Sequence, residues 1–308
     1  MMTAKQKKAI KHTLTCWAMG GLPVFGFILF MFLPMLISLW LGFTELHVFE
    51  LDKAKWVGVE NYKNVFADPM FYKAIVNTLY SLISVPISML FGLLLAVLLN
   101  NESLKFRGVF KALFFLPFVC SSVVVTTTFM WLFDVSEFGI INSILKSCGL
   151  NTVSFLTTPA LIMPIATVMT VWNGTGQYML IFQAALTNIN KEVLEASAID
   201  GANAEKRFFK IILPLISPTA FYLFTTGLIG GLQNFVMFQV LASATSGTLY
   251  GPSDACITLV FYLYQSAFTN VYLNGPGFAA AIAWVVAVII MIATWLNFKL
   301  SKKWVNYD

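Results

Sequence analysis

Long apolar runs without charged residues divide this chain, and they limit its possible folds more than any other feature. Residues 13–44, 147–190 and 211–253 contain no Lys, Arg, Asp or Glu. A helix needs about 20 apolar residues to cross the hydrocarbon layer of a membrane. The pattern predicts an all-α integral membrane protein with six transmembrane helices, at about residues 16–43, 74–99, 112–133, 161–186, 211–232 and 278–298.

The composition and the charge distribution agree with this class. Hydrophobic residues make up 58% of the chain and charged residues 11%, whereas soluble domains carry about 25% charged residues. The net charge of +5 is spread over short segments between the apolar runs, so the contiguous basic patch of a nucleic-acid binder is missing. Of the 19 Lys and Arg residues, 14 lie in the N-terminus, the second and fourth loops and the tail. By the positive-inside rule, we expect these segments and both termini to be cytoplasmic.

We expect a single transmembrane domain over residues 16–300, between a cytoplasmic N-terminus (1–15) and a cytoplasmic tail (301–308). The first run is far longer than the apolar core of a cleavable signal peptide, which is about 7–15 residues. It should therefore be a retained span, with tilt or a kink at Pro23 or Pro34. Asp68 and Pro69 have the pattern of a helix start. The apolar stretch 258–268 is short enough to be re-entrant or interfacial.

A second local pattern indicates an amphipathic surface helix in the loop 134–159. Its apolar residues have helical spacing, and Gly149 is placed to end the helix; these residues are Ile140, Ile141, Ile144 and Leu145.

Metal and acid–base chemistry has little material in this chain. The four cysteines, Cys16, Cys120, Cys148 and Cys256, lack paired metal-ligand spacing. Cys148 and Cys256 fall in expected outer loops and could pair, although free thiols are favoured. His12 and His47 lie far from any cysteine or acidic cluster, which argues against a zinc site or a histidine base. We expect no metal and no catalytic residue.

A charged segment, residues 195–214, interrupts the apolar pattern between the fourth and fifth spans. Asn188 or Asn190 can cap a first short helix, Gly201 can take the left-handed conformation that ends it, and Asn203 can cap a second. The pattern predicts two short helices joined at a glycine and projecting into the cytoplasm. A well-solvated loop is the alternative.

The charged segment also carries a spaced signature. It consists of Glu195, Ala196 and Ser197, then after three residues Gly201, after nine more Ile211, and after one more Leu213 and Pro214. This resembles the EAA signature of ABC-importer permeases, and within them the sugar permeases similar to the larger maltose permease and the glycerol-phosphate permease. The segments WVGVENYKNVF, WNGTGQYMLIFQAALTNI and GFAAAIAW resemble family segments in the same order. Departures are Ser197 for the second alanine, Asn190 for a usual proline, and Gln177 and Gln183 at usually apolar positions.

The resemblance implies a type I ABC importer permease fold whose loop 187–210 is a cytoplasmic coupling helix docked on an ATPase subunit. Glu195 would make the polar contact, Ala196 and Ser197 would allow close approach, and Gly201 would form the turn; the signature also includes Asp200, Leu213 and Pro214. Implied partners are a second homologous permease, two copies of a cytoplasmic ATPase, an extracytoplasmic substrate-binding protein and the lipid bilayer of a bacterial inner membrane. Because the chain has no GxxxxGK[ST] phosphate loop, we expect no ATP hydrolysis here, with ATP and Mg held by the ATPase partner and no cofactor on this chain.

Polar residues within the expected spans mark a candidate substrate pathway, since polar side chains facing lipid are costly. These are Asn173, Gln177, Tyr178 and Gln183 in the fourth span and Gln233, Asn234 and Gln239 at the fifth. Interhelical hydrogen bonding is an equally open explanation. The absence of charged residues from the spans favours a neutral solute, and the resemblance favours a carbohydrate. The alternatives are a polyol or glycerol phosphate as the solute, a stand-alone secondary transporter, and a scaffold without transport.

Overall fold

The computed structural model describes residues 4–46, 54–101, 104–136, 138–243, 249–269 and 275–306, and most of them are helical. His47 and the last two residues of the tail lie outside the described residues. The all-α expectation is confirmed, and the one strand pairing among the described residues is a short antiparallel ladder. The chain divides into two compact units, Met1–Ala67 with Leu263–Val285, and Asp68–Tyr262 with Val286–Asp308.

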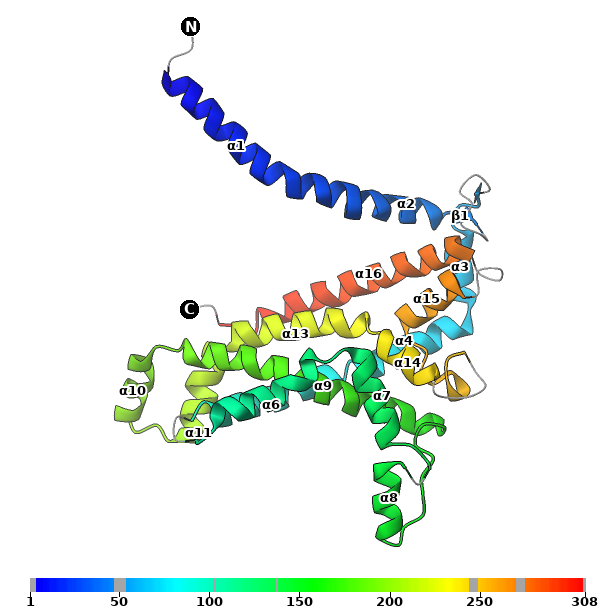
Figure 1. Ribbon diagram of the computed structural model, residues 1–308. Helices are drawn as coiled ribbons and strands as arrows, with labels where there is room; N and C mark the ends of the chain where they lie inside the picture. Colours follow the sequence, from blue (N-terminus) through cyan, green and yellow to red (C-terminus); the bar gives the residue numbers. More distant parts are fainter. Residues whose placement is uncertain are drawn as a thin grey trace. The chain divides into compact units, whose positions relative to one another are not determined.

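The first unit begins with one long helical rod and ends in a small hairpin region (Figure 1). Its elements are α1 (Ala4–Phe27), the π-helical turn η1 (Ile28–Phe32), α2 (Leu33–Leu41), β1 (Thr44–Glu45), β2 (Lys55–Trp56) and α3 (Glu60–Ala67). The irregular turn directly precedes Pro34, whose ring lacks an N–H and crowds the preceding turn. The helix continues through Pro23 without a break. Of the two prolines expected to disturb the first span, only Pro34 lies beside a change of helical register.

The hairpin region of the first unit is held by side chains of the WVGVENYKNVF segment. The Asn61 side-chain amide donates to the carbonyl oxygens of Gly42 (3.1 Å) and Thr44 (2.8 Å), which follow the end of α2. Phe43 stacks on Trp56 with ring centroids 5.5 Å apart. The backbone groups released at the end of α2 are therefore satisfied from α3.

The second unit contains most of the remaining helices. They are α4 (Pro69–Ser81), α5 (Ser84–Leu99), α6 (Arg107–Val119), α7 (Ser122–Leu132), α8 (Ile140–Ser147), α9 (Pro159–Thr187), α10 (Lys191–Ile199), α11 (Ala204–Arg207), the π-helical turn η3 (Phe208–Ile212), α12 (Leu213–Leu215), α13 (Ser217–Leu232), α14 (Val236–Ser243) and the short turn η4 (Pro252–Asp254). Helices α15 (Leu259–Phe268) and α16 (Gly275–Ser301) contribute residues to both units.

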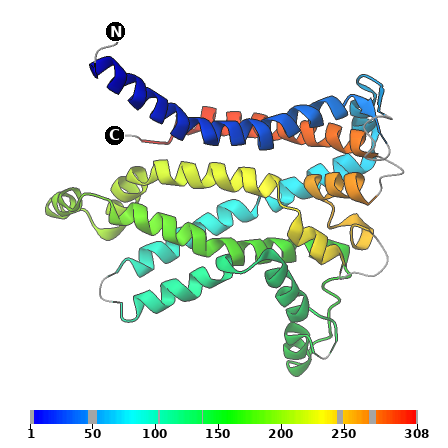
Figure 2. The same cartoon turned by 45° about the horizontal axis from the view of Figure 1, so that its top comes forward.

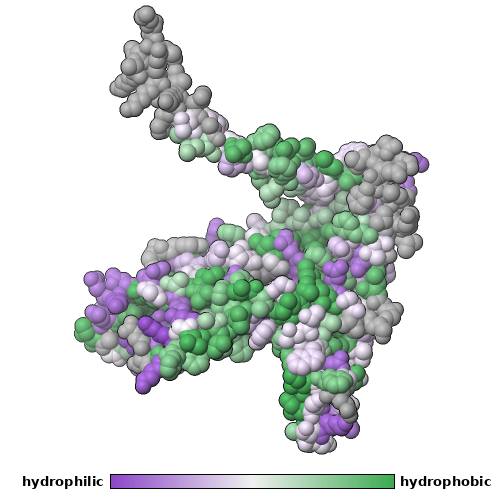
Figure 3. All heavy atoms as spheres, viewed as in Figure 1, coloured by the Kyte–Doolittle hydropathy of each residue, from purple (hydrophilic) through white to green (hydrophobic). Residues whose placement is uncertain are grey.

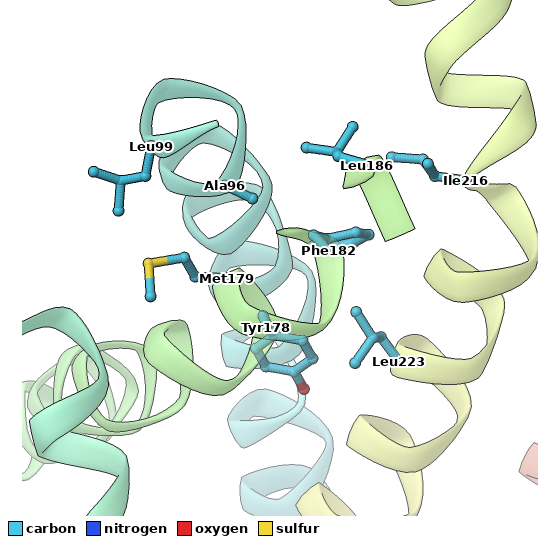
Figure 4. Packing of buried hydrophobic residues seen from close by; sticks show 8 residues of the cluster. All are labelled: Ala96, Leu99, Tyr178, Met179, Phe182, Leu186, Ile216 and Leu223. Carbon is cyan, nitrogen blue, oxygen red and sulfur yellow. The ribbon is translucent and has the colours of Figure 1, made fainter. Parts of the chain in front are cut away.

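Helix α9 is the centre of the second unit, and it runs between α13 and α6 in both views (Figures 1 and 2). Glycines allow its neighbours to approach its backbone: a Cβ on Gly92 of α5 would lie 2.5 Å from the Tyr178 Cβ. Where α5, α9 and α13 meet, apolar side chains form a buried cluster (Figure 4). Its members are Ala96, Leu99, Tyr178, Met179, Phe182, Leu186, Ile216 and Leu223.

Two of the expected spans are bent rather than straight. Residues 112–133 were expected to form one helix, but α6 and α7 meet at 98° because Cys120 and Ser121 are extended and Ser121 caps a new helix. The helix ending at Leu215 and α13 meet at 62° beside Pro214 and Pro218. Proline removes a helical hydrogen bond and crowds the preceding turn. Pro117 lies just before the first bend, and Pro214 and Pro218 flank the second.

Three helical stretches in the described residues are long and apolar enough to cross a membrane without a sharp bend, and the two bent pairs raise this to five; the three are Thr15–Leu41, Pro69–Leu99 and Gly275–Ser301. Helix α9 is long enough, but polar residues in its middle lower its hydropathy. The six-span topology and the single-domain boundaries therefore stay predictions.

Local signals in the loops are confirmed. Asp68 caps α4 by accepting the Met70 N–H at 2.8 Å, with Pro69 at the first helical position. Helix α8 has the expected bounds, and Gly149 follows it at φ 77°.

Cys148 is exposed and Cys256 is buried, and both are free. Burial raises the pKa of the Cys256 thiol to about 12, so this thiol is protonated at neutral pH.

The loop before α15 is fastened to α4 of the same unit. The Asn77 amide donates to the carbonyl oxygens of Asp254, Ala255 and Ile257, the last at 2.9 Å. The Lys73 ammonium donates to the Ser253 carbonyl and pairs with Asp254 at 3.7 Å. The Tyr262 hydroxyl donates to the Asp68 carboxylate. Helix α15 is short, as expected, and both the re-entrant and the interfacial assignments remain open.

Replacing Gly92 with alanine should weaken the contact between α5 and α9. The added Cβ would lie 2.5 Å from the Tyr178 Cβ and 2.9 Å from the Met179 nitrogen, so the helices must separate. We expect a loss of about 1–3 kcal/mol, measured as a lower unfolding temperature of the purified protein in detergent. Gly108→Ala is the control, because its Cβ meets nothing within 4 Å. Equal unfolding temperatures for the two variants would contradict this packing.

Candidate functional site

The charged segment folds into two short helices joined at a glycine, as the sequence predicted. Asn190, rather than Asn188, caps α10, since its side-chain oxygen accepts the Glu192 N–H at 3.0 Å. Gly201 has φ 72°, and the Ala202 N–H bonds the Ser197 carbonyl at 3.0 Å to close the helix. The Asn203 side-chain oxygen then accepts the Lys206 N–H at 2.8 Å and starts α11.

The signature residues divide into an outer and an inner group. Glu195, Ala196, Asp200 and Gly201 are exposed, and the neighbouring apolar Ile199 is 87% exposed. Figure 3 shows hydrophilic atoms gathered over the end of the molecule that bears α10 and α11. Among the described residues, no ion pair engages the Glu195 carboxylate. The outer group thus offers an unpaired carboxylate beside an uncovered isoleucine.

The inner group anchors the segment to its own chain. Ser197 is buried, and its hydroxyl donates to the Leu194 carbonyl at 2.7 Å. Leu213 and Ile212 are partly buried against the cluster of α5, α9 and α13. Pro214 is half-buried beside the 62° bend. The small Ser197 side chain therefore faces the interior, and the surface left for close approach is at Ala196.

A polar cavity of about 290 Å³ lies between α4, α5, α9 and α13. Four residues that the sequence marked as a pathway line it together: Asn173, Gln177, Tyr178 and Asn234. Helix α5 and the end of α4 add hydroxyl groups, and α13 adds glycines. These added residues include Ser81, Ser84, Ser88, Gly227, Gly230 and Gly231. No charged residue is among the described residues that line the cavity. Such a cavity suits a neutral, hydroxyl-bearing solute.

The hydrogen bonds in the cavity leave two amides available. The Asn173 amide donates to the Pro117 carbonyl at 2.7 Å, where α6 approaches its end. No hydrogen bond engages the side chains of Gln177 and Asn234 within the described part of the chain. These serine hydroxyls donate to backbone carbonyls three or four residues earlier, Ser84 to Ser81 at 2.6 Å and Ser88 to Ser84 at 2.7 Å, so their oxygens can still accept. The free donors and acceptors therefore face the cavity from α9, from Asn234 two residues beyond the end of α13, and from α5.

Three residues of the predicted pathway do not line this cavity. Gln183 is buried and donates to the Leu99 carbonyl at 3.3 Å, so it satisfies the end of α5. Gln233 is exposed, and Gln239 is half-buried in α14. Sequence reasoning missed the serines of α4 and α5, although their spacing of three and four residues would have placed them on one helical face.

A second cavity, of about 770 Å³, lies between α5, α6 and α9. It is larger, but its lining is almost wholly apolar and includes Phe91, Phe114 and Trp172. Without convergent polar groups it offers a hydroxylated solute no hydrogen bonds. The smaller polar cavity is therefore the better candidate site.

Comparison with known proteins gives consistent similarities. Residues 88–306 match the family described as binding-protein-dependent transport system inner membrane component. The probable ABC transporter permease protein YesP of Bacillus subtilis is 33% identical over 307 residues, covering 99% of this chain and 96% of that protein. The arabinooligosaccharides transport system permease protein AraP of the same organism is 33% identical over 279 residues, covering 90% and 85%.

One solved structure extends the similarity to the whole fold. It is a chain of a bacterial alginate ABC transporter in complex with an alginate pentasaccharide-bound periplasmic protein. The TM-score is 0.81 at 25% sequence identity, and the match covers 96% of each chain. The described helices therefore follow a known membrane architecture over nearly their whole length.

Proposed function

Because this chain belongs to the family of binding-protein-dependent transport system inner membrane components, we propose that it is one membrane subunit of an ATP-driven importer, forming half of the pathway for a carbohydrate. The resemblance read from the spaced signature is confirmed, and so is the importer permease fold. The observation that carries the substrate class is the uncharged cavity, where the Gln177 and Asn234 amides have no partner among the described residues.

The solute is an oligosaccharide or sugar derivative, delivered by an external binding protein and moved by alternating access. Amides and serine hydroxyls can exchange hydrogen bonds with sugar hydroxyl groups, and Tyr178 and Phe118 present aromatic surface. The relative AraP named above belongs to a transport system for arabinooligosaccharides. A polyol fits the same lining. Glycerol phosphate fits it less well, since no described lining residue supplies a cation for the phosphate.

Energy enters through the charged segment from two copies of a cytoplasmic ATPase subunit, which hold ATP and Mg. The exposed Glu195 carboxylate and the uncovered Ile199 supply a polar and an apolar contact, and Ala196 permits close approach. Gly201 sets the angle between the two short helices. This chain contributes no catalytic residue and binds no metal or cofactor.

A second homologous permease completes the pathway in the bacterial inner membrane, with both termini cytoplasmic. The span Thr15–Leu41 is long and apolar enough to cross a membrane. A stand-alone secondary transporter is less well supported, since ion-coupled transport relies on ionisable residues within the membrane, and the described cavity lining has none.

Uptake by the whole complex tests this function. The chain is co-expressed with its partner permease, the ATPase subunit and the binding protein, and the complex is purified and reconstituted in proteoliposomes. We expect ATP-dependent uptake of at least one member of a panel of labelled neutral sugars, which includes arabino-oligosaccharides and galactosides, identified first as a ligand of the binding protein. Uptake of glycerol phosphate alone would replace the proposed substrate class, and uptake without ATP would reject the importer.

Replacing Gly201 with valine should abolish coupling without disturbing assembly. Its φ of 72° is strongly unfavourable for a β-branched residue, so the turn between α10 and α11 must change. We expect uptake to fall by at least about tenfold while the ATPase subunits still co-purify. Gly149→Val is the matched control, since Gly149 has φ 77° at the end of α8, far from the signature in sequence. Wild-type uptake by Gly201→Val with the ATPase still bound would remove the coupling role.

Replacing the unpartnered amides of the cavity should weaken solute binding. Gln177→Leu and Asn234→Leu each remove a hydrogen-bonding group and leave the described interhelical bonds intact. We expect KM for uptake to rise about tenfold for each, because a hydrogen bond to a solute contributes roughly 1 kcal/mol or more. Gln233→Leu changes an exposed amide outside the cavity and should leave KM unchanged. An unchanged KM for both cavity variants would show that these side chains serve packing only.

A further inference from the structure

Residues 302–306, the last that the structure describes, lie against the bend that joins the charged segment to α13. Helix α16 is fixed to α13 by the Asn297 amide, which donates to the Thr225 hydroxyl at 2.7 Å, and by Phe298, whose ring is 5.0 Å from that of Phe221. Both contacts lie within the second unit. They lead the tail, residues 302–306, toward the start of α13.

The tail then contacts α13 at two points. The Trp304 ring meets the Phe221 ring edge-on, with centroids 6.3 Å apart. The backbone N–H of Asn306 donates to the Ser217 hydroxyl at 2.9 Å. Ser217 is buried at the first position of α13, so its oxygen accepts from the tail in a protected environment.

The same hydroxyl crosses the bend. Ser217 donates its proton to the Pro214 carbonyl at 2.7 Å, on the other side of the 62° angle. The chain of bonds therefore runs from the tail, through one hydroxyl, to the last residue of the coupling signature. Hydrogen bonds that share a hydroxyl in this way strengthen one another.

A cavity of about 340 Å³ lies beside these contacts. It is lined by Phe209, Leu213 and Pro214 before the bend, by Ser217 and Ala220 after it, and by Trp304 and Asn306 of the tail. The cavity is open at the surface, where Phe209, Trp304 and Asn306 are exposed. It gives the bend space in which to change its angle, and the tail is bonded to the Ser217 hydroxyl, which links the two sides of the bend.

We propose that residues 302–306 are a positioning brace which holds the bend at Ile216 and Ser217, so that movement of the docked charged segment turns α13. This inference rests on the proposed function, because it gives the brace a role in coupling ATP hydrolysis to uptake. Trp304 and Asn306 touch neither the solute cavity nor the exposed signature residues. They act through Ser217 and Phe221. A mere anchor of the tail at the membrane interface, where tryptophan is common, predicts no effect on coupling.

The test measures solute molecules imported per ATP hydrolysed by the complete complex in proteoliposomes. Asn306→Pro removes the N–H that bonds Ser217, and Asn306→Ala keeps it. Trp304→Ala removes the ring, and Trp304→Phe keeps an aromatic edge. Lys303→Ala changes an exposed neighbour in the tail. We expect imported solute per ATP to fall about threefold or more in Asn306→Pro and Trp304→Ala, and to stay at the wild-type ratio in the other three variants.

A variant that fills the cavity tests whether the bend needs this space to change its angle. Ala220→Leu places extra atoms in the cavity next to Trp304. We therefore expect ATP hydrolysis and uptake to slow in proportion, so that the solute imported per ATP hydrolysed is unchanged. Wild-type ratios in Asn306→Pro and Trp304→Ala, or a loss confined to the yield of the complex in both, would overturn the brace. Failure of the wild-type complex to import any solute would overturn the proposed function and the brace with it.

Discussion

The rest of this structure depends on the approach of α5 and α6 to the backbone of α9. A Cβ on Gly92 would lie 2.5 Å from the Tyr178 Cβ, and one on Gly176 would lie 2.3 Å from the Phe114 carbonyl oxygen. Helices in lipid gain little from the hydrophobic effect, so packing at small residues holds them together. These contacts fix the rotation of α9, which decides that Gln177 faces the polar cavity and that Phe182 faces the buried cluster.

Broken helices create the need for the polar side chains around them. Where α5 and α6 end, carbonyl groups lose helical partners, and an unsatisfied group in hydrocarbon costs several kcal/mol. Gln183 bonds the Leu99 carbonyl and Asn173 bonds the Pro117 carbonyl. In the first unit Asn61 does the same after α2. Hydrogen bonding to helix ends therefore accounts for Asn173 and Gln183, and the proposed solute role stays with Gln177 and Asn234.

Local chemistry made much of the fold predictable. Asp68 and Asn203 cap helices and Gly201 forms a left-handed turn, as predicted, because caps and such turns depend on a few adjacent residues. The bend between α6 and α7 was missed, since Pro117 disturbs a helix without showing in sequence whether the next residues recover it or become extended. The buried position of Ser197 was missed because a signature gives spacing and not the direction of each side chain.

The candidate cavity was predictable only in part, for a related reason. Hydropathy finds polar residues in an apolar span, and four of the seven selected line the cavity. It gives no weight to serine, which barely lowers hydropathy, or to glycine, which contributes by having no side chain. The wall of α13 is open because Gly227, Gly230 and Gly231 face it, and a Cβ on Gly227 would lie 2.4 Å from the Tyr178 hydroxyl. Only the pairing of helices shows which small residues matter.

Helix α13 connects the bend after the charged segment to the wall of the polar cavity. This helix starts at the bend, at Ser217, and carries the cavity wall at Gly227 and beyond. With a rise of 1.5 Å per residue the distance from the bend to Gly227 is about 15 Å. A turn of roughly 10° at the bend would therefore shift the wall by about 2–3 Å, on this helical geometry. That shift is comparable to a hydrogen-bond length. In the proposed importer, a small rotation at the charged segment would therefore make or break contacts with a bound solute, although no charged residue is among the described residues that line the cavity.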